Sequence, residues 1–273
     1  FLEEYTVDRI TSRLVAVGIL GAFLWRPKAF GLRSPKKMGL DFKPGWKKEV
    51  AAGVAISIIV AFTGTVVLFH FDARSWDLEN DFEWAEFLVD LVKALVGVAI
   101  IGFVEEYFFR GVLLRLFMRR SRFWMAACYS SLIYAAVHFF RLKDYAPPGE
   151  FHPLEGFAVM GHLLDPIARD WLGSLSSFWG LYLAGLIFCY AFFRTGRLFV
   201  SVGLHAGWVF FTKLDGNLTD HEDFGLRWLY GSGDMIDGVM IQLLVLGVAA
   251  GFVLWQRLPR MIGGESSAEK QAV

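Results

Sequence analysis

Residues 102–111 read Gly-Phe-Val-Glu-Glu-Tyr-Phe-Phe-Arg-Gly, and they place two adjacent carboxylates inside an otherwise apolar part of the chain. The apolar run extends from Ala94 to Met118 and is interrupted only by this cluster and by Arg115. Ionisable side chains at membrane depth are costly and rare, and they usually serve a function. The stretch therefore predicts a membrane-spanning helix that carries a polar site.

The composition is that of a membrane protein. Of the 273 residues, 55% are hydrophobic and 16% aromatic, and the 20% that are charged cluster between apolar runs. Soluble domains are only about 45–50% apolar. We therefore expect an integral membrane protein in contact with a lipid bilayer. The net charge is zero and we find no nucleic-acid motif, so no nucleic-acid partner is predicted.

The apolar runs predict an all-α, polytopic transmembrane helical bundle of about six or seven spans. The predicted spans are Val50–Phe71, a long helix from Trp84 to Arg120, Phe123–Phe140, Leu175–Phe193, Leu198–Thr212 and Val239–Trp255. The long helix would measure about 55 Å, more than the bilayer core, so its ends must protrude, tilt or break. Leu14–Trp25 is shorter than the usual span of about 20 residues, so it either spans with Ile10 and Thr11 or lies at the interface.

Three segments follow from this pattern. Residues 1–83 hold the N-terminal membrane segment or segments and a basic loop, and residues 84–213 hold a core with an extramembrane insert at about 141–174. Residues 214–273 hold the last span and a polar tail. The insert is rich in proline and contains His152 and His162, which we interpret as ordinary loop residues or as part of a cap or partner surface.

Charge alternates between successive loops. The loops at 26–48, 115–122 and 194–197 are basic, and those at 72–86 and 213–237 are acidic. Because cytoplasmic loops of membrane proteins carry an excess of Lys and Arg, we expect the basic end and the C-terminus to be cytoplasmic.

Glu105 and Glu106 are the first candidates for chemistry. Neighbouring residues on a helix differ by about 100°, so we expect the two carboxylates to face different partners. Arg110 lies four residues after Glu106 on the same helix face, and an unpaired charge in an apolar setting is strongly destabilising. We predict a structural ion pair between Glu106 and Arg110, with Glu105 left free to act. The competing interpretation is an ion-pair network that serves helix packing only.

Two histidines, His138 and His205, also lie in apolar runs. The small residues around His205, among them Gly203 and Gly207, predict close packing of a neighbouring helix or of substrate backbone. One buried polar network could include both histidines and the glutamates. In one chemistry, a carboxylate and a histidine activate water and other donors stabilise an oxyanion. In the other, Glu105, His138 and His205 bind Zn²⁺, which activates the water. No His-Glu-x-x-His pattern is present, so such ligands would come from three helices.

Three motifs occur in order on successive hydrophobic helices. They read Glu105-Glu106-Tyr-Phe-Phe-Arg110, Tyr134-Ala-Ala-Val-His138 and His205-Ala-Gly-Trp-Val209. Through these motifs, over roughly residues 90–212, the chain resembles the CPBP family of intramembrane proteases, also called the CAAX-protease and bacteriocin-processing (Abi) family.

The resemblance implies an intramembrane endopeptidase in which Glu105 is the general base and works with His138 to activate water. His205 would help to hold the oxyanion, with Glu106, Arg110 and Tyr134 in support. It implies a glutamate-dependent reaction without a cofactor, with zinc as the alternative. The substrate would be a membrane-embedded or membrane-anchored protein, or a lipidated or hydrophobic peptide.

Two positions differ from the family pattern. Tyr134 stands where the family has Phe, and Val209 stands where the prenyl-protease branch has Asn as an oxyanion donor. Since Val cannot donate a hydrogen bond, Trp208 or a backbone N–H would have to replace it. This difference favours a divergent bacterial member in the cell membrane over a prenyl-CAAX protease. It also keeps open a rival function, a catalytically silent binding or immunity scaffold.

Overall fold

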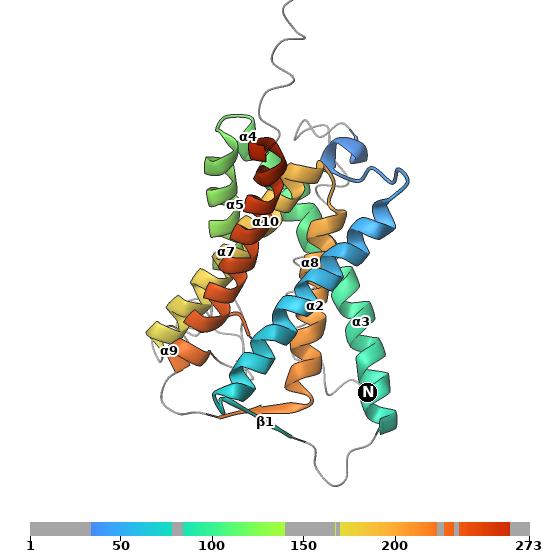
Figure 1. Ribbon diagram of the computed structural model, residues 1–273. Coiled ribbons are helices and arrows are strands. Elements are labelled where there is room, and N and C mark those ends of the chain that lie inside the picture. Colours follow the sequence, from blue (N-terminus) through green and yellow to red (C-terminus); the bar gives the residue numbers. More distant parts are fainter. Residues whose placement is uncertain are drawn as a thin grey trace, which may run out of the picture.

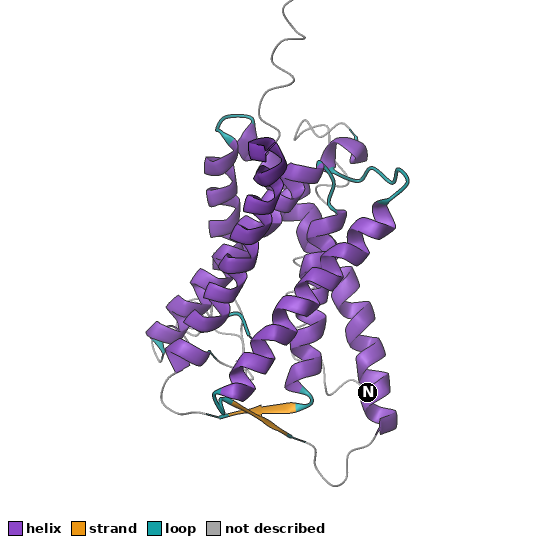
Figure 2. Cartoon of the chain, in the orientation of Figure 1, coloured by secondary structure: helices purple, strands orange, loops and turns teal. Residues whose placement is uncertain are grey.

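The structure of the protein is a computed structural model that describes residues 34–77, 84–139, 167, 170–222, 227–231 and 235–262. In chain order the elements are η1 (Pro35–Met38, a 3₁₀-helix), α2 (Trp46–His70), β1 (Arg74–Trp76), α3 (Trp84–Glu106), η2 (Tyr107–Leu114, a π-helix), α4 (Arg115–Met118), α5 (Phe123–Val137), α7 (Trp171–Thr195), α8 (Phe199–Gly216), β2 (Thr219–His221), α9 (Arg227–Tyr230) and α10 (Val239–Ile262). The described residues are mostly helical, as predicted, and Figure 2 shows a short ribbon of two strands among them at one end.

The predicted long helix is present and runs without a break through α3, η2 and α4, although its middle turn is π-helical. Helix α7 begins at Trp171, earlier than the predicted Leu175. The reason is a helix cap, because Asp170 Oδ1 accepts a hydrogen bond from the Gly173 N–H at 2.9 Å. At the other end of α7, Gly196 adopts a left-handed conformation (φ 67°) and makes the tight turn into α8.

Three described helices are long and apolar enough to cross a membrane: Trp46–His70, Phe87–Met118 and Trp171–Thr195. Phe123–Val137 and Val239–Ala250 are shorter apolar helices. In the Phe87–Met118 span only 11% of the most apolar window is buried in the protein, which leaves most of its side chains to face lipid. The protein is therefore an integral membrane protein, and the predicted total of six or seven spans stays a prediction.

Several predicted features lie outside the described residues. These are the Leu14–Trp25 run, the insert up to residue 166 with His152 and His162, and the tail from residue 263.

Helix α8 is central to the bundle (Figure 1). It packs against α2, α3 and α7, while α5 packs against α7 and η2. One apolar cluster includes Leu114 and Leu198 near the basic loops. Another includes Leu68 and Phe211 near the ribbon, and an aromatic cluster packs against Leu204 of α8.

Glycines bring α2 and α8 into contact at the level of the backbone. A Cβ on Gly203 would overlap the Val50 carbonyl oxygen, and a Cβ on Gly207 would overlap Ser57 Oγ. This confirms the close neighbour predicted from the small residues around His205, and it identifies that neighbour as α2.

Ion pairs fasten the α2–α8 pair at both ends. At the basic end Arg197, just before α8, pairs with Glu49 in the first turn of α2. At the acidic end Arg74 Nη2 lies 3.0 Å from Asp215 Oδ2, with both side chains almost fully buried. Thr65 Oγ1 of α2 donates to Asp215 Oδ1 at 2.9 Å. No feature of the sequence predicted this second buried pair.

The two ends of the bundle carry opposite charge, as the loop pattern predicted. The described basic loops, 34–45, 119–122 and 194–198, gather at the upper end in Figure 1. The antiparallel ribbon, in which Ser75 pairs with Asp220, lies at the lower, acidic end.

The glycine contact between α2 and α8 can be tested with Gly203→Ala. The added methyl group would meet the Val50 carbonyl and the Gly53 Cα, and we expect the free energy of unfolding to fall by about 1–3 kcal/mol. Thermal unfolding of the purified protein in detergent measures this change. The matched control is Gly97→Ala on α3, where a Cβ meets nothing within 4 Å. Equal effects of the two substitutions would contradict the contact.

Candidate active site

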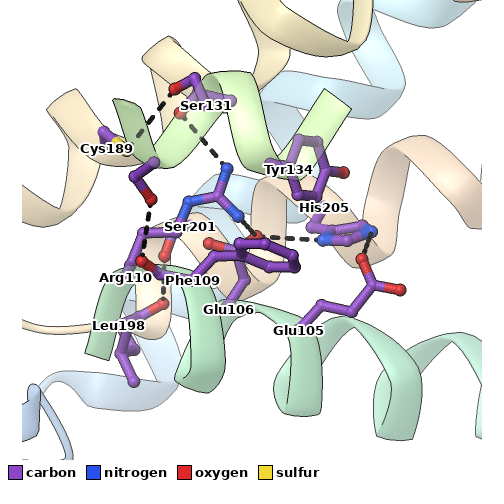
Figure 3. Close-up of polar contacts among 12 residues, drawn as sticks. Glu105, Glu106, Phe109, Arg110, Ser131, Tyr134, Cys189, Leu198, Ser201 and His205 are labelled. Carbon is purple, nitrogen blue, oxygen red and sulfur yellow. Dashed lines mark hydrogen bonds and ion pairs between the residues drawn. The ribbon is translucent and has the colours of Figure 1, made fainter. Parts of the chain in front are cut away.

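The three motifs converge inside the bundle (Figure 3). Glu105 and Glu106 end α3, Arg110 lies in η2, His138 directly follows α5, and His205 lies in α8. Residues almost 100 positions apart in the chain therefore share one polar cluster, as the sequence analysis predicted.

The predicted ion pair between Glu106 and Arg110 is confirmed. Arg110 Nη1 donates to Glu106 Oε1 at 2.8 Å, and both side chains are completely buried. Arg110 Nη2 also donates to the Gly185 carbonyl of α7 at 3.3 Å. The guanidinium lies over the Tyr134 ring, 4.6 Å from its centroid, and near Phe188 at 5.0 Å. Two aromatic rings and a carbonyl thus surround a buried cation that one carboxylate neutralises.

The π-helix η2 begins directly after Glu106 and contains Arg110. In a π-helix the backbone bonds run from residue i to i+5, a rare arrangement that often marks functional sites. Ser130 Oγ of α5 donates to the Phe109 carbonyl at 3.1 Å. This side-chain bond ties the π-helical turn to α5 and so helps to hold Arg110 in place.

His205 contacts both glutamates. Its Nδ1 lies 3.0 Å from Glu106 Oε1, and its Nε2 lies 3.9 Å from Glu105 Oε2 (Figure 3). The expectation that adjacent carboxylates face different partners was therefore wrong. The two nitrogens of an imidazole point in opposite directions, so a single ring between helices can reach two carboxylates that diverge on one helix.

Hydrogen bonding defines the tautomer of each histidine. The Glu106 carboxylate can only accept, so His205 donates from Nδ1. His138 Nδ1 lies 2.7 Å from the Tyr134 carbonyl, which also can only accept. Both histidines therefore carry a proton on Nδ1, and in the neutral form each has a lone pair on Nε2.

These two Nε2 atoms face the same oxygen. Glu105 Oε2 lies 3.8 Å from His138 Nε2 and 3.9 Å from His205 Nε2. The Glu105 side chain is 28% exposed, yet Oε2 itself is buried and makes no hydrogen bond with any described residue. Glu105 Oε2 and the Nε2 atoms of both histidines therefore face one another. The rest of the Glu105 side chain is partly exposed beside them.

Aromatic rings enclose this point. Phe109, Tyr134 and Phe188 form a buried cluster. The His205 ring stacks on Phe188 with centroids 5.4 Å apart, and the Tyr134 ring meets His138 edge-on at 4.5 Å. Polar interactions are stronger in such apolar surroundings than in water.

The donor set of one carboxylate and two imidazoles is one that Zn²⁺ accepts. As these side chains lie, however, no three His, Cys, Asp or Glu residues in the described part of the chain are arranged to hold a metal ion.

The other predicted residues have different positions. Tyr134 is buried between Arg110 and the histidines. Trp208 packs with the cluster of Phe211 and Met235, a different group from the rings around His205. Its predicted role as an oxyanion donor stays a prediction.

Sequence reasoning missed three contributors, namely Ser130, Gly185 and Phe188. They act through a hydroxyl, a backbone carbonyl and an aromatic ring. Such groups are common in membrane helices, so nothing in the sequence distinguished these three.

The part of the chain that carries the candidate site is similar to a known protein family. Residues 87–211 match a family model described as type II CAAX prenyl endopeptidase Rce1-like. The matched range begins in α3, ends in α8 and includes all three motifs. No curated protein and no solved structure shows a significant match.

The buried ion pair can be tested with Arg110→Gln, which leaves the Glu106 carboxylate without its cation. We expect the free energy of unfolding to fall by about 3–5 kcal/mol, because a buried charge would be uncompensated. The double variant Glu106→Gln/Arg110→Gln should recover part of this loss, since Gln can still accept from His205. Unfolding in detergent measures both.

Lys93→Gln is the matched control, because Lys93 pairs with Asp90 on the exposed surface of α3 and should matter little. If the double variant is no more stable than Arg110→Gln, the unpaired Glu106 carboxylate is not the cause of the lost stability.

Proposed function

Because this chain belongs to the CPBP family of intramembrane proteases, we propose that it hydrolyses a peptide bond with a water molecule activated by Glu105 and His138. The substrate is a membrane-embedded or membrane-anchored protein or peptide. Family membership supplies the class of activity, and the geometry around Glu105 supports the assignment of roles.

One observation carries the proposal. Glu105 Oε2 lies within 4 Å of the Nε2 atoms of both histidines, in a setting lined by aromatic rings. A water molecule bound there can donate one proton toward Glu105 and the other toward His138 Nε2. Its oxygen lone pair is then directed away from both, toward a substrate carbonyl.

The reaction follows in two steps. Glu105 Oε2 takes a proton from water while the water oxygen bonds to the carbonyl carbon, which forms a tetrahedral oxyanion. The C–N bond then breaks, and Glu105 returns the proton to the departing amine. The products are a carboxylic acid and an amine, and Glu105 ends as it began.

His205 is suited to stabilise the oxyanion when it is doubly protonated. Glu106 accepts from its Nδ1–H at 3.0 Å and supports the imidazolium, whose Nε2–H would then donate to the oxyanion. Arg110 balances the charge of Glu106, and Glu105 balances that of His205. Protonated His205 would thus supply an oxyanion donor, which the apolar side chain of Val209 cannot supply.

We place the protein in a bacterial cell membrane with its basic end and C-terminus in the cytoplasm. The segregation of charge between the two ends of the bundle supports this orientation.

Glu105→Gln should abolish proteolysis without unfolding the protein. Gln has nearly the same shape but cannot take the proton, and loss of a general base typically slows a reaction about 10²- to 10⁴-fold. The membrane proteomes of cells with wild type or Glu105→Gln would be compared, and we expect uncleaved precursors to accumulate only with the variant.

Asp90→Asn is the control, because it removes an exposed carboxylate from the same helix α3. Equal membrane levels and equal unfolding midpoints establish that the variants fold. An unchanged proteome with a folded Glu105→Gln protein would refute the hydrolase and leave the silent scaffold as the better explanation.

The zinc-dependent alternative is supported by the donor set alone, and it makes a distinct prediction. If water is activated by Glu105 and His138 without metal, 1,10-phenanthroline should leave cleavage of an identified precursor unchanged. The purified protein should contain much less than one zinc per chain. Loss of cleavage on chelation, with recovery on adding Zn²⁺, would instead make Glu105, His138 and His205 the ligands.

A further inference from the structure

The basic end of the bundle contains a polar pocket that the proposed reaction does not use. Its volume is about 410 Å³, and η1, the loop before α2 and the α7–α8 turn line it. The lining residues are Lys36, Asp41, Lys43, Pro44, Thr195, Gly196 and Arg197. Three of these side chains are cations and only one is an anion.

The two lysines are available to a ligand. Their Nζ atoms lie 3.8 Å (Lys36) and 3.5 Å (Lys43) from the same Asp41 oxygen, which is too far for a good hydrogen bond. Both side chains are more than 60% exposed, at 63% and 66%. One carboxylate thus neutralises two ammonium groups only in part.

Arg197 gives the pocket a rigid wall. It pairs with Glu49, and its Nη1 donates to the carbonyls of Asp41 and Lys43 at 3.5 and 3.4 Å. The loop that carries Lys43 is therefore held in place before any ligand arrives, which lowers the entropic cost of binding.

The pocket lies where two membrane-spanning helices end. Span α7 ends at Thr195, which lines the pocket, and span α2 begins at Trp46, just after the lining residue Pro44. Phe42, 58% exposed, packs against Trp46 with ring centroids 5.4 Å apart. Trp and Tyr are enriched at the level of the lipid headgroups, and Trp46 fits this depth.

From these observations we propose that the pocket binds the phosphate of an anionic phospholipid headgroup. Lys36 and Lys43 donate to the phosphate oxygens, and the exposed Phe42 ring lies beside the acyl chains. Basic pockets between spans at the membrane surface suit such headgroups. A soluble phosphate would gain nothing from the adjacent apolar ring.

The bound lipid would also support the active site. Met38 Sδ, in η1, accepts a hydrogen bond from the Tyr107 hydroxyl at 2.8 Å, and Tyr107 directly follows Glu106. The Gly39 carbonyl accepts from the Leu198 N–H at 3.1 Å, directly before α8. The same loop therefore braces both helical segments that carry the site, and a ligand that holds the loop should raise the thermal stability of the whole protein.

The test measures lipid binding to the purified full chain in neutral detergent by native mass spectrometry. The probes are dioleoyl phosphatidylglycerol, dioleoyl phosphatidylcholine and sn-glycerol 3-phosphate. We expect phosphatidylglycerol to bind most tightly and to raise the unfolding temperature. Each lysine near an anionic lipid contributes about fivefold in affinity, so Lys36→Gln/Lys43→Gln should weaken phosphatidylglycerol binding about thirtyfold.

The control is Lys47→Gln/Lys48→Gln, which removes the same charge from exposed residues at the same end, outside the pocket. It should have little effect. If both double variants weaken phosphatidylglycerol binding equally, the lipid is attracted by the general positive charge of this end, and the proposed binding site in the pocket is wrong. Equal binding of the two lipids would overturn the preference for an anionic headgroup, and binding of glycerol 3-phosphate as tight as that of phosphatidylglycerol would identify a soluble phosphate site instead.

Discussion

The site depends on one buried oxygen. Glu106 Oε1 accepts hydrogen bonds from Arg110 and from His205, and all three side chains are almost entirely removed from solvent. In such surroundings an unpaired charge is very costly, so α3, η2 and α8 have low energy only in the register that joins these groups. The same contact puts the proton of His205 on Nδ1 and aims its Nε2 at Glu105. A structural ion pair thereby sets the geometry of the candidate catalytic residues.

This geometry requires α8 to be held firmly, and different interactions hold it along its length. In its middle, Gly203 and Gly207 let α2 approach at backbone distance. At its ends, the pairs Glu49–Arg197 and Arg74–Asp215 join it to α2 and the ribbon. Close packing limits sliding, and the two charged ends limit rotation. His205 lies between these anchors, so contacts outside the candidate site also help to position its ring.

The π-helix η2 is a rare departure from α-helical structure, of a kind that often marks functional sites. It places Arg110 beside the Tyr134 ring of α5, the Phe188 ring of α7 and the Gly185 carbonyl of α7. The charged side chains at the basic end of the bundle differ from Arg110 in their exposure and pairing. The lysines of the basic pocket are exposed and lie 3.8 and 3.5 Å from Asp41 Oδ2, whereas Arg110 is fully buried and lies 2.8 Å from Glu106 Oε1.

The sequence by itself determined the class of protein and predicted most residues of the candidate site. Long apolar runs predicted helices, because backbone groups in lipid must bond internally. Glutamates and histidines within the apolar runs could be recognised as candidate site residues, because ionisable side chains are rare at membrane depth. Only the tertiary structure showed the π-helical turn, the second buried pair of Arg74 and Asp215, and the stacking of Phe188 on His205. It also corrected the expectation that Glu105 and Glu106 would have separate partners. Helix periodicity predicts only the directions in which Glu105 and Glu106 leave their own helix. Whether a side chain of another helix, here His205, can contact both is decided by how the helices pack.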